Sequence, residues 1–272
     1  LEADHAVNAD LTTSQARQLV DQLVQLGQAQ DVMPILVFSG GEPLCRDDVF
    51  EVMHYAATNR LKCALATNGT LIDEHIAGKI KQAGVARVSV SLDGATGEVH
   101  NKLRQLEGSF DAAVNGTRFL RDCGVPFQIN MTMTRFNKHQ LNDIFILAEK
   151  LGAVAVHLFM LVPVGCGESF DAADMLSASE YEQLLIQVVR KKHDIGLEIK
   201  VTCGPHYQRI IRQQKQADGP TASILQDQSS GKHPGHKHEA IFRGCLAGSG
   251  VLFVSHSGDV FPCGYLPIHC GN

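Results

Sequence analysis

The sequence lacks the long apolar runs, the basic excess and the leader segment that would place it in several large classes of protein. No apolar run reaches the length needed to span a bilayer, so we expect no membrane partner. The net charge of -5 gives no sign of the basic excess that is typical of nucleic-acid-binding proteins. The first ten residues, LEADHAVNAD, look like neither a signal nor a transit peptide. We therefore expect a cytoplasmic protein.

The composition is that of an ordinary globular protein, apart from an unusual number of cysteines. The 272 residues are 44% hydrophobic, enough for one large domain or a domain with a smaller appendage. Eight cysteines in a cytosolic protein suggest metal ligands before disulfides. The first five are scattered, and most are interpreted as small buried hydrophobes. The last three lie near the C-terminus and are the better ligand candidates.

Helical and strand patterns alternate along the first part of the chain. Helices are predicted at residues 12–27, 47–59, 73–83, 109–122 and 138–151. Strands are predicted at residues 33–39, 62–67, 87–92, 126–134 and 154–162. The strands are nearly continuous apolar runs, as a parallel sheet buried on both faces requires. This alternation predicts an α/β fold built from parallel βα units, with ligands at the C-terminal ends of the strands.

The regular alternation of helical and strand patterns ends near residue 177. We therefore divide the sequence into four predicted segments. Residues 1–176 form the predicted barrel, and 177–215 a helical connection with an extended stretch at 197–202. Residues 216–243 are polar and predicted to be a mobile loop, whose histidines (His233, His236 and His238) either bind metal or belong to a solvated linker. Residues 244–272 are compact and include a hairpin that turns at Ser257 and Gly258.

Polar and glycine residues follow each of the predicted strands. The stretches are SGGEP (39–43), TNGT (67–70), SLDG (91–94), NMTMT (130–134) and LVPVGCG (161–167). Glycines let the backbone approach a ligand closely, and Glu42 makes its turn suitable for a cation such as an ammonium group. Asp93 is placed to accept hydrogen bonds from the hydroxyls of a ribose. Arg104 is either a partner for a carboxylate or a solvent-facing helix charge.

Ammonium, carboxylate and ribose together describe an amino-acid nucleoside, and S-adenosylmethionine (SAM) fits this description. The predicted SAM-binding residues are Ser39, Gly40, Gly41, Glu42, Thr67, Asn68, Ser91, Asp93, Arg104, Asn130, Thr132 and Leu161.

These stretches also carry a family resemblance. GGEPL, TNGT and SLDG resemble the strand-end motifs of radical SAM enzymes over roughly residues 1–165. The resemblance implies a partial (β/α)6 barrel of the TIM type. It also implies a 4Fe-4S cluster that cleaves SAM to a 5′-deoxyadenosyl radical, and an electron donor of the ferredoxin or flavodoxin type. No residue stands out as a general acid or base, so we expect the cofactor, and not a side chain, to carry out the radical chemistry.

The C-terminal segment resembles the start of the auxiliary (SPASM-type) iron–sulfur module of this family. Cys245, Gly258 and Cys263 have its spacing, and the resemblance implies that Cys245 and Cys263 bind an auxiliary 4Fe-4S cluster, with Cys270 as a further ligand candidate. One departure is large, because no three cysteines have the CxxxCxxC spacing that holds the radical SAM cluster. We expect that the first barrel strand, the cluster loop and the later module cysteines are missing, and that this form does not cleave SAM.

The stretches LFMLVPVGCG and VTCGPHYQRIIRQ resemble the tetrapyrrole-modifying branch of the family. Within it, the resemblance is greatest to the heme synthases of the siroheme-dependent pathway. That resemblance implies an iron-porphyrin substrate, iron-coproporphyrin III, in which two propionates are oxidatively decarboxylated to the vinyls of heme b. The heme d1 biosynthesis enzymes and the didecarboxysiroheme deacetylases are alternatives. A non-catalytic tetrapyrrole carrier, or an ordinary barrel enzyme without radical chemistry, is an alternative of another class.

Residues that could meet the carboxylates of such a substrate lie in PHYQRIIRQ. The candidates are His206, Tyr207, Arg209 and Arg212, and a surface helix explains the same residues equally well. Cys166 and Cys203 lie in loops beside these stretches, so a role near the substrate is a further hypothesis.

Overall fold

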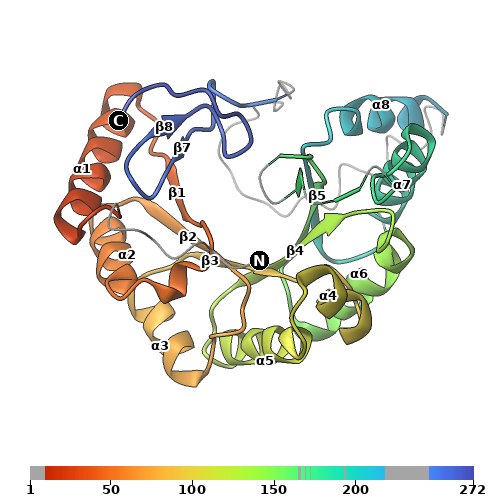
Figure 1. The fold of residues 1–272 in the computed structure, drawn as a ribbon, viewed down its shortest axis with the longest axis horizontal. Helices are drawn as coiled ribbons and strands as arrows, with labels where there is room; N and C mark the ends of the chain where they lie inside the picture. The colour runs from red at the N-terminus through yellow and green to blue at the C-terminus, as the bar shows by residue number, and fades with distance from the viewer. Residues whose placement is uncertain (1–9, 165–166, 169, 172, 193, 218–244) are drawn as a thin grey trace.

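A computed structural model describes residues 10–164, 167–168, 170–171, 173–192, 194–217 and 245–272. Six parallel strands form one sheet in which each strand pairs with the next along the chain. They are β1 (Ile35–Phe38), β2 (Lys62–Thr67), β3 (Arg87–Ser91), β4 (Phe127–Met133), β5 (Ala155–Met160) and β6 (Glu198–Thr202). The sheet curls into an open half-barrel with helices on its convex side (Figure 1). The predicted partial (β/α)6 barrel of parallel strands is confirmed.

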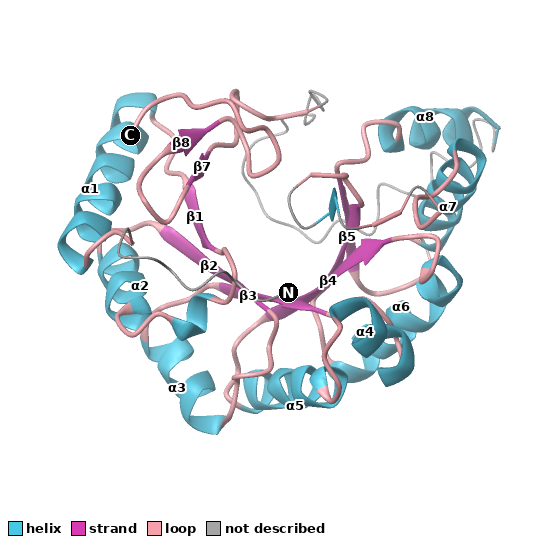
Figure 2. Ribbon diagram, in the orientation of Figure 1, coloured by secondary structure: helices cyan, strands magenta, loops and turns pink. Residues whose placement is uncertain are grey.

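The described residues form eight α-helices and two short 3-10 turns. The α-helices are α1 (Thr13–Gln30), α2 (Val49–Thr58), α3 (Glu74–Gln82), α4 (Gly97–Arg104), α5 (Ser109–Asp122), α6 (Leu141–Leu151), α7 (Ala178–Lys191) and α8 (Tyr207–Ala217). The 3-10 turns are η1 (Pro43–Cys45) and η2 (Lys138–Gln140). A capping box of Thr12 and Gln15 starts α1, since each side chain accepts a hydrogen bond from the other residue's backbone amide. Figure 2 shows the helices as an outer layer around the strands.

The hydrophobic core lies between the convex face of the sheet and the helices. Successive strand residues point to opposite faces, so Leu65, Val90 and Leu158 point to the helices and are completely buried. Phe127 of β4 and Phe145 of α6 fill the same layer, each with 1% of its surface exposed. The alternate residues of each strand therefore point to the concave face of the sheet.

The concave face departs from the prediction that the strands are buried on both sides. Ile35 and Val37 of β1 are 61% and 52% exposed. The prediction is wrong for β1, because this strand lies at one end of the described sheet and the described residues do not cover its concave side. On β4 the alternating positions that face inward are polar: Gln128, Asn130 and Thr132.

Two further elements differ from the sequence prediction. The helix α4 was not predicted, because GEVHNKLR is polar and buries only Val99 and His100. The extended stretch predicted at 197–202 is β6, which pairs in parallel with β5 and so continues the barrel sheet beyond residue 177. Of the loop predicted at residues 216–243, residues 216 and 217 are instead the last two of α8. The remainder, with its three histidines, lies outside the described residues, as does Cys166.

The C-terminal segment forms the predicted hairpin. Its strands β7 (Phe253–Val254) and β8 (Val260–Phe261) are antiparallel, and the turn between them contains Gly258 at a φ of 96°. The Leu11 amide donates to the His256 carbonyl at 2.8 Å, which ties the hairpin to the stretch just before α1. In Figure 1 the hairpin accordingly lies beside α1 and β1.

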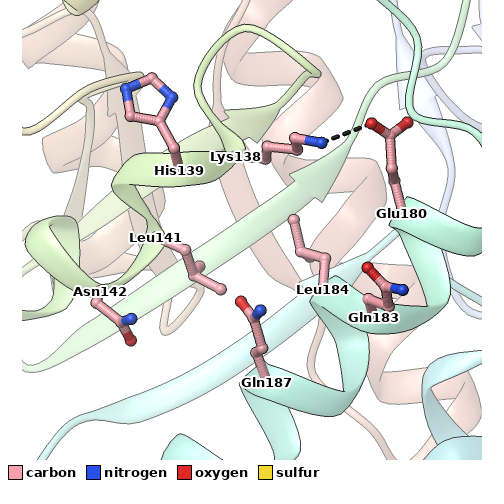
Figure 3. A pocket seen from close by; sticks show the side chains of 8 residues that line it. All are labelled: Lys138, His139, Leu141, Asn142, Glu180, Gln183, Leu184 and Gln187. Atoms are coloured by element: carbon pink, nitrogen blue, oxygen red, sulfur yellow. Dashed lines mark hydrogen bonds and ion pairs between the residues drawn. The ribbon is translucent and has the colours of Figure 1, made fainter.

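A cavity of about 270 Å³ lies between η2–α6 and α7 (Figure 3). At its rim the Lys138 ammonium pairs with Glu180 at 2.5 Å, and Arg135 pairs with the same carboxylate at 3.0 Å. The Lys138 ammonium, the hydrogen bonds from Ser177 and then Arg135 hold the pKa of Glu180 well below its ordinary value. The cavity lies between helices on the convex side of the sheet, so it forms no part of the strand-end site. Among the described residues, none of the helices is both long enough and apolar enough to cross a membrane.

Candidate functional site

Glu42 is fixed in the turn after β1 by three hydrogen-bond donors. Its Oε1 accepts from the Thr67 hydroxyl at 2.7 Å and from the Leu44 amide at 3.1 Å, and its Oε2 accepts from the Asn68 amide at 2.8 Å. The structure thus brings the predicted residues of SGGEP and TNGT together. A carboxylate offers about four acceptor positions, so Glu42 retains capacity for a bound cation.

The glycine turn before Glu42 leaves its backbone open to a ligand. Gly40 has a φ of 136°, which strongly favours glycine, and no atom lies within 4 Å of the position that a Cβ would take. Ser39 and Gly41 beside it are exposed. An open backbone next to a fixed carboxylate can receive a cationic group such as an ammonium.

The TNGT loop is packed tightly against α5. A Cβ on Gly116 of α5 would lie 2.5 Å from the Gly69 carbonyl oxygen, so glycine is required for this close approach. The Asn68 side chain turns back on its own loop, where its oxygen accepts from the amide and hydroxyl of Thr70 at 2.8 and 2.7 Å. Contact between Asn68 and a ligand remains a prediction. Such a contact would use the side-chain nitrogen, because the side-chain oxygen is already bonded within the loop.

Asp93, in the loop after β3, already has partners within the protein. Its Oδ2 lies 2.7 Å from Nε of Arg104, and its Oδ1 accepts from the Thr132 amide at 2.7 Å. The Asp93 side chain is 8% exposed and that of Arg104 is 29% exposed, so this ion pair is largely buried. The Arg104 Nε makes no aligned hydrogen bond to a described residue despite its burial. Arg104 thus pairs with a carboxylate of the protein itself, whereas the carboxylate expected for it was that of the ligand, so its contact with a ligand stays a prediction.

Two buried residues that sequence reasoning missed hold this loop in place. Nδ1 of His100 accepts from the Asp93 amide at 3.0 Å, and burial lowers the pKa of His100 to about 4, so it is neutral near pH 7. Asn137, which is fully buried, donates to the carbonyls of Asp93 and Thr132 at 2.8 and 2.7 Å. Neither residue stands at a predicted strand end, so position gave no signal for them.

The concave wall below the strand ends carries a further polar network. Gln128 donates to Asn130 at 2.9 Å, and the ring of His157 contacts the Thr202 hydroxyl. Burial lowers the pKa of His157 to about 4, and the nearby Lys200 charge lowers it further. Asn130 pairs in register with both Ser91 and His157. The predicted residues Ser91 and Asn130 are therefore neighbours on the concave face, and Leu161 follows directly after β5.

The predicted substrate contacts of α8 do not share one environment. Tyr207 is 6% exposed and packs in the core, where its hydroxyl has no hydrogen-bond partner among the described residues. Arg209 pairs with Glu182 of α7 at 2.8 Å, and His206 and Arg212 are exposed. This arrangement favours the surface-helix reading, and substrate contact by these residues remains a prediction.

The thiols of the C-terminal segment and of the loop after β6 differ in exposure, because Cys245 and Cys270 are exposed whereas Cys263 and Cys203 are partly buried. Cys263 accepts a hydrogen bond from the Tyr265 amide at 3.4 Å. Burial raises the pKa of Cys203, and the nearby thiols of Cys263 and Cys245 raise it further. Cys270 is exposed and donates to the Ile268 carbonyl at 3.4 Å. Within the described ranges, no three His, Cys, Asp or Glu side chains are placed around a single metal ion.

A half-barrel of parallel strands, with a glycine-rich carboxylate turn and polar strand ends, defines a barrel of the radical SAM type. The sequence profile of the Radical SAM superfamily matches residues 10–148, and the chain belongs to this superfamily.

The chain also has close relatives. It is 43% identical over 263 residues to the "AdoMet-dependent heme synthase" of Methanosarcina barkeri (strain Fusaro / DSM 804), an alignment that covers 97% of this chain and 70% of the relative. It is 32% identical over 256 residues to the "Fe-coproporphyrin III synthase" of the same organism, covering 89% of this chain and 60% of the relative. Streptococcus suis SuiB bound to S-adenosylmethionine superposes with a TM-score of 0.67 at 14% identity, covering 95% of this chain and 54% of SuiB. At that identity the likeness to SuiB shows the fold alone.

Proposed function

We propose that SAM binds at the C-terminal ends of β1 to β5. The Glu42 carboxylate takes the ammonium group, and the exposed backbone of Ser39, Gly40 and Gly41 lies along the amino-acid part of the ligand. The fixed orientation of Glu42 supports this proposal, because the Thr67 hydroxyl and the Asn68 amide determine where its charge lies before a ligand arrives. Asp93 and Arg104 shape the adjacent wall as a preformed ion pair.

We propose further that the chain is the core of a heme-forming enzyme. The substrate is iron-coproporphyrin III, and two of its propionates are oxidatively decarboxylated to the vinyl groups of heme b. The observation that carries this proposal is the 43% identity to a heme synthase over 97% of the chain. The identity to the Fe-coproporphyrin III synthase is lower, at 32%, and makes that activity the second candidate.

The cofactor supplies the chemistry, since SAM reductively cleaved at a 4Fe-4S cluster gives a radical that removes hydrogen from the substrate. The residues of this chain do not include the three thiolates for that cluster, because no three of its cysteines follow CxxxCxxC. The cleavage step is therefore not assigned to any residue here. The role of the chain is to bind and orient SAM at the strand ends and to present the porphyrin on the concave side of the barrel. We also propose an auxiliary iron–sulfur cluster in the C-terminal segment, and a ferredoxin or flavodoxin as electron donor.

Two measurements test these proposals. Calorimetry on this chain should show SAM binding, and an absence of binding would remove the strand-end site. The enzyme that joins this chain to a CxxxCxxC cluster loop should be incubated without oxygen with reductant, SAM and iron-coproporphyrin III. We expect 5′-deoxyadenosine together with mono- and divinyl products. If 5′-deoxyadenosine forms and the porphyrin is unchanged, the heme-synthase assignment is wrong. Didecarboxysiroheme in a parallel reaction tests the second candidate, and porphyrin binding without SAM cleavage would indicate a carrier.

A further inference from the structure

The concave face of the half-barrel has an apolar side and a polar side. Alternate residues of a strand share this face with their register partners on the next strand. Apart from Lys62, the side chains that β1 and β2 place on it are apolar: Ile35, Val37, Ala64 and Ala66. On β5 and β6 the same face carries His157, Lys200 and Thr202. Because β1 and β5 lie on opposite sides of the opening (Figure 1), a ligand between them meets apolar groups at one end and polar groups at the other.

The hydrogen bonds on the polar side run in one direction, which Arg87 determines. A guanidinium can only donate, so the side-chain oxygen of Gln128 faces Arg87, at 3.4 Å. The Gln128 nitrogen then faces Nδ1 of His157 at 3.4 Å and donates to Asn130 at 2.9 Å. Nδ1 is therefore an acceptor. The ring is neutral near pH 7, so it carries its proton on Nε2, which donates to the Thr202 hydroxyl oxygen.

The Thr202 hydroxyl still has a hydrogen to donate. Its oxygen accepts from His157, and no acceptor for its hydrogen is found among the residues that the structure describes. Thr202 is the last residue of β6 and is partly exposed, so this hydrogen can reach a ligand on the concave side. The network thus prefers a ligand group that accepts hydrogen bonds.

Positive charge exceeds negative charge beside this hydroxyl. Lys200 lies two residues before Thr202, on the same face of β6. Lys200 and Arg87 share one carboxylate, since each lies 3.3 Å from an oxygen of Glu198. The Lys200 side chain is 49% exposed, so its ammonium can turn to a ligand. A negatively charged acceptor such as a carboxylate suits both the hydroxyl and the ammonium.

We propose that a propionate carboxylate of the substrate binds between the Thr202 hydroxyl and the Lys200 ammonium, with the porphyrin ring against the apolar side chains of β1 and β2. The inference rests on the proposed porphyrin substrate and names the groups that orient it. A porphyrin has an apolar ring and anionic arms, which match the change from apolar to polar across this face. The small side chains of Ala64 and Ala66 suit the flat face of such a ring.

The test compares the binding of two probes to this chain, followed by the absorption spectrum of the porphyrin. One probe is iron-coproporphyrin III, and the other is its amide derivative, in which every propionate is neutral. We expect the parent to bind the acid more tightly. Lys200→Gln and Thr202→Val should each reduce this preference by about 3- to 10-fold, because each removes a group that interacts more strongly with a carboxylate than with an amide.

Three further variants complete the test. Thr202→Ser keeps the hydroxyl, and Lys150→Gln removes an equal charge at an exposed position of α6, so both should keep the preference of the parent. Val37→Thr keeps the branched shape of its side chain. It should weaken the binding of both probes alike, by about 2- to 3-fold, because both contain the ring. Unchanged binding of both probes to Val37→Thr would overturn the placement of the ring.

The inference is overturned if the parent binds both probes equally, or if Lys200→Gln and Thr202→Val keep its preference for the acid. In these outcomes the porphyrin still binds, so the proposed substrate stands. If the parent binds neither probe, the inference fails together with the proposal that this chain presents the porphyrin. Thr202→Val also removes the acceptor of His157, so thermal unfolding is measured for each variant. Lys200→Gln leaves that hydrogen bond intact and decides the test if Thr202→Val does not fold.

Discussion

Two carboxylates at the strand ends, Glu42 and Asp93, differ in what surrounds them. Glu42 is half-buried, accepts only from neutral donors and has no cation among its described contacts. Asp93 is buried, and Arg104 already balances its charge. Glu42 is therefore suited to bind a cationic ligand group, whereas Asp93 is suited to keep the loop after β3 in place.

The Asp93→Asn substitution should destabilise the fold. It leaves the Arg104 charge without a partner in a mostly buried place, while the amide oxygen still accepts from Thr132. Breaking a buried pair costs about 3–5 kcal/mol, and the partial exposure of Arg104 reduces this to about 2 kcal/mol. Urea unfolding measures the loss, with Arg17→Gln as the control because its pair with Glu51 is exposed and worth less than about 1 kcal/mol. Unchanged stability with lost SAM affinity would make Asp93 a ligand contact instead.

The Glu42→Gln substitution should weaken SAM binding. It removes the negative charge and places an amide NH2 where the protein presents only donors. Loss of a charge-assisted hydrogen bond of about 1.5–3 kcal/mol corresponds to roughly a 10- to 100-fold rise in Kd. Isothermal calorimetry checks this value, and Glu51→Gln on the exposed face of α2 is the control. Equal affinity in the two variants would mean that the ammonium group binds elsewhere.

At the scale of elements, the contact of α5 with the TNGT loop supports the site from behind. Gly116 allows α5 to approach the Gly69 carbonyl, and the same loop carries Thr67 and Asn68, which orient Glu42. Helix packing on the convex side thereby determines the position of a charge at the strand ends.

Two glycine-to-alanine substitutions should have opposite effects on stability. Alanine favours a helix over glycine by about 1 kcal/mol. At Gly78 of α3 no atom lies within 4 Å of the position that a Cβ would take, so Gly78→Ala should stabilise the protein by about 0.5–1 kcal/mol. Gly116→Ala should destabilise it by about 1–3 kcal/mol, because its Cβ would lie 2.5 Å from a backbone oxygen. Gly116→Ala should also weaken SAM binding. Thermal unfolding and calorimetry check both, and stabilisation by Gly116→Ala would show that the loop shifts freely.

Sequence patterns located most elements of the barrel, but not every surface that the elements create. Residues 62–67 and 109–122 were predicted with the bounds that the structure has, because apolar periodicity and closing glycines mark them clearly. The exposure of Ile35 and Val37 was missed, since an apolar strand looks the same whether or not its concave face is covered. Helix α4 was missed because its interior side contributes only two buried residues.

At the scale of the whole molecule, the missed features come from contacts between distant parts of the chain. The strand-end motifs identified Glu42 and Thr67, because parallel strands bring their C-terminal ends to one edge. The pairing of Asp93 with Arg104 had no such rule, because Arg104 ends the helix α4, which the sequence did not predict. Contacts of this kind depend on how distant loops and helices pack against each other.

Two histidines, the buried His100 and the partly buried His157, should make the stability of the whole protein fall as the solution becomes more acidic. Burial lowers the pKa of each from its ordinary value of 6.5 to about 4. Between these two pH values the unfolded chain binds more protons than the folded one, so the free energy of unfolding rises with pH. The contribution of the two histidines to stability is therefore lost as the pH falls below 6.5. Between pH 7 and pH 5 the loss is at most about 2 kcal/mol for each histidine, and less for His157, which is only partly buried.

Urea unfolding at pH 7 and pH 5 measures this dependence. Carboxylates with lowered pKa, such as Asp48 and Glu182, titrate mainly below this range and contribute little to it. His157→Gln can still hydrogen-bond to Thr202, and it should reduce the difference between the two pH values. His54→Gln, at an exposed position of α2, should leave the difference as it is in the parent. Equal stability of the parent at both pH values would mean that the concave wall admits a charged imidazole, and the interior of the half-barrel would then be wetter than this packing implies.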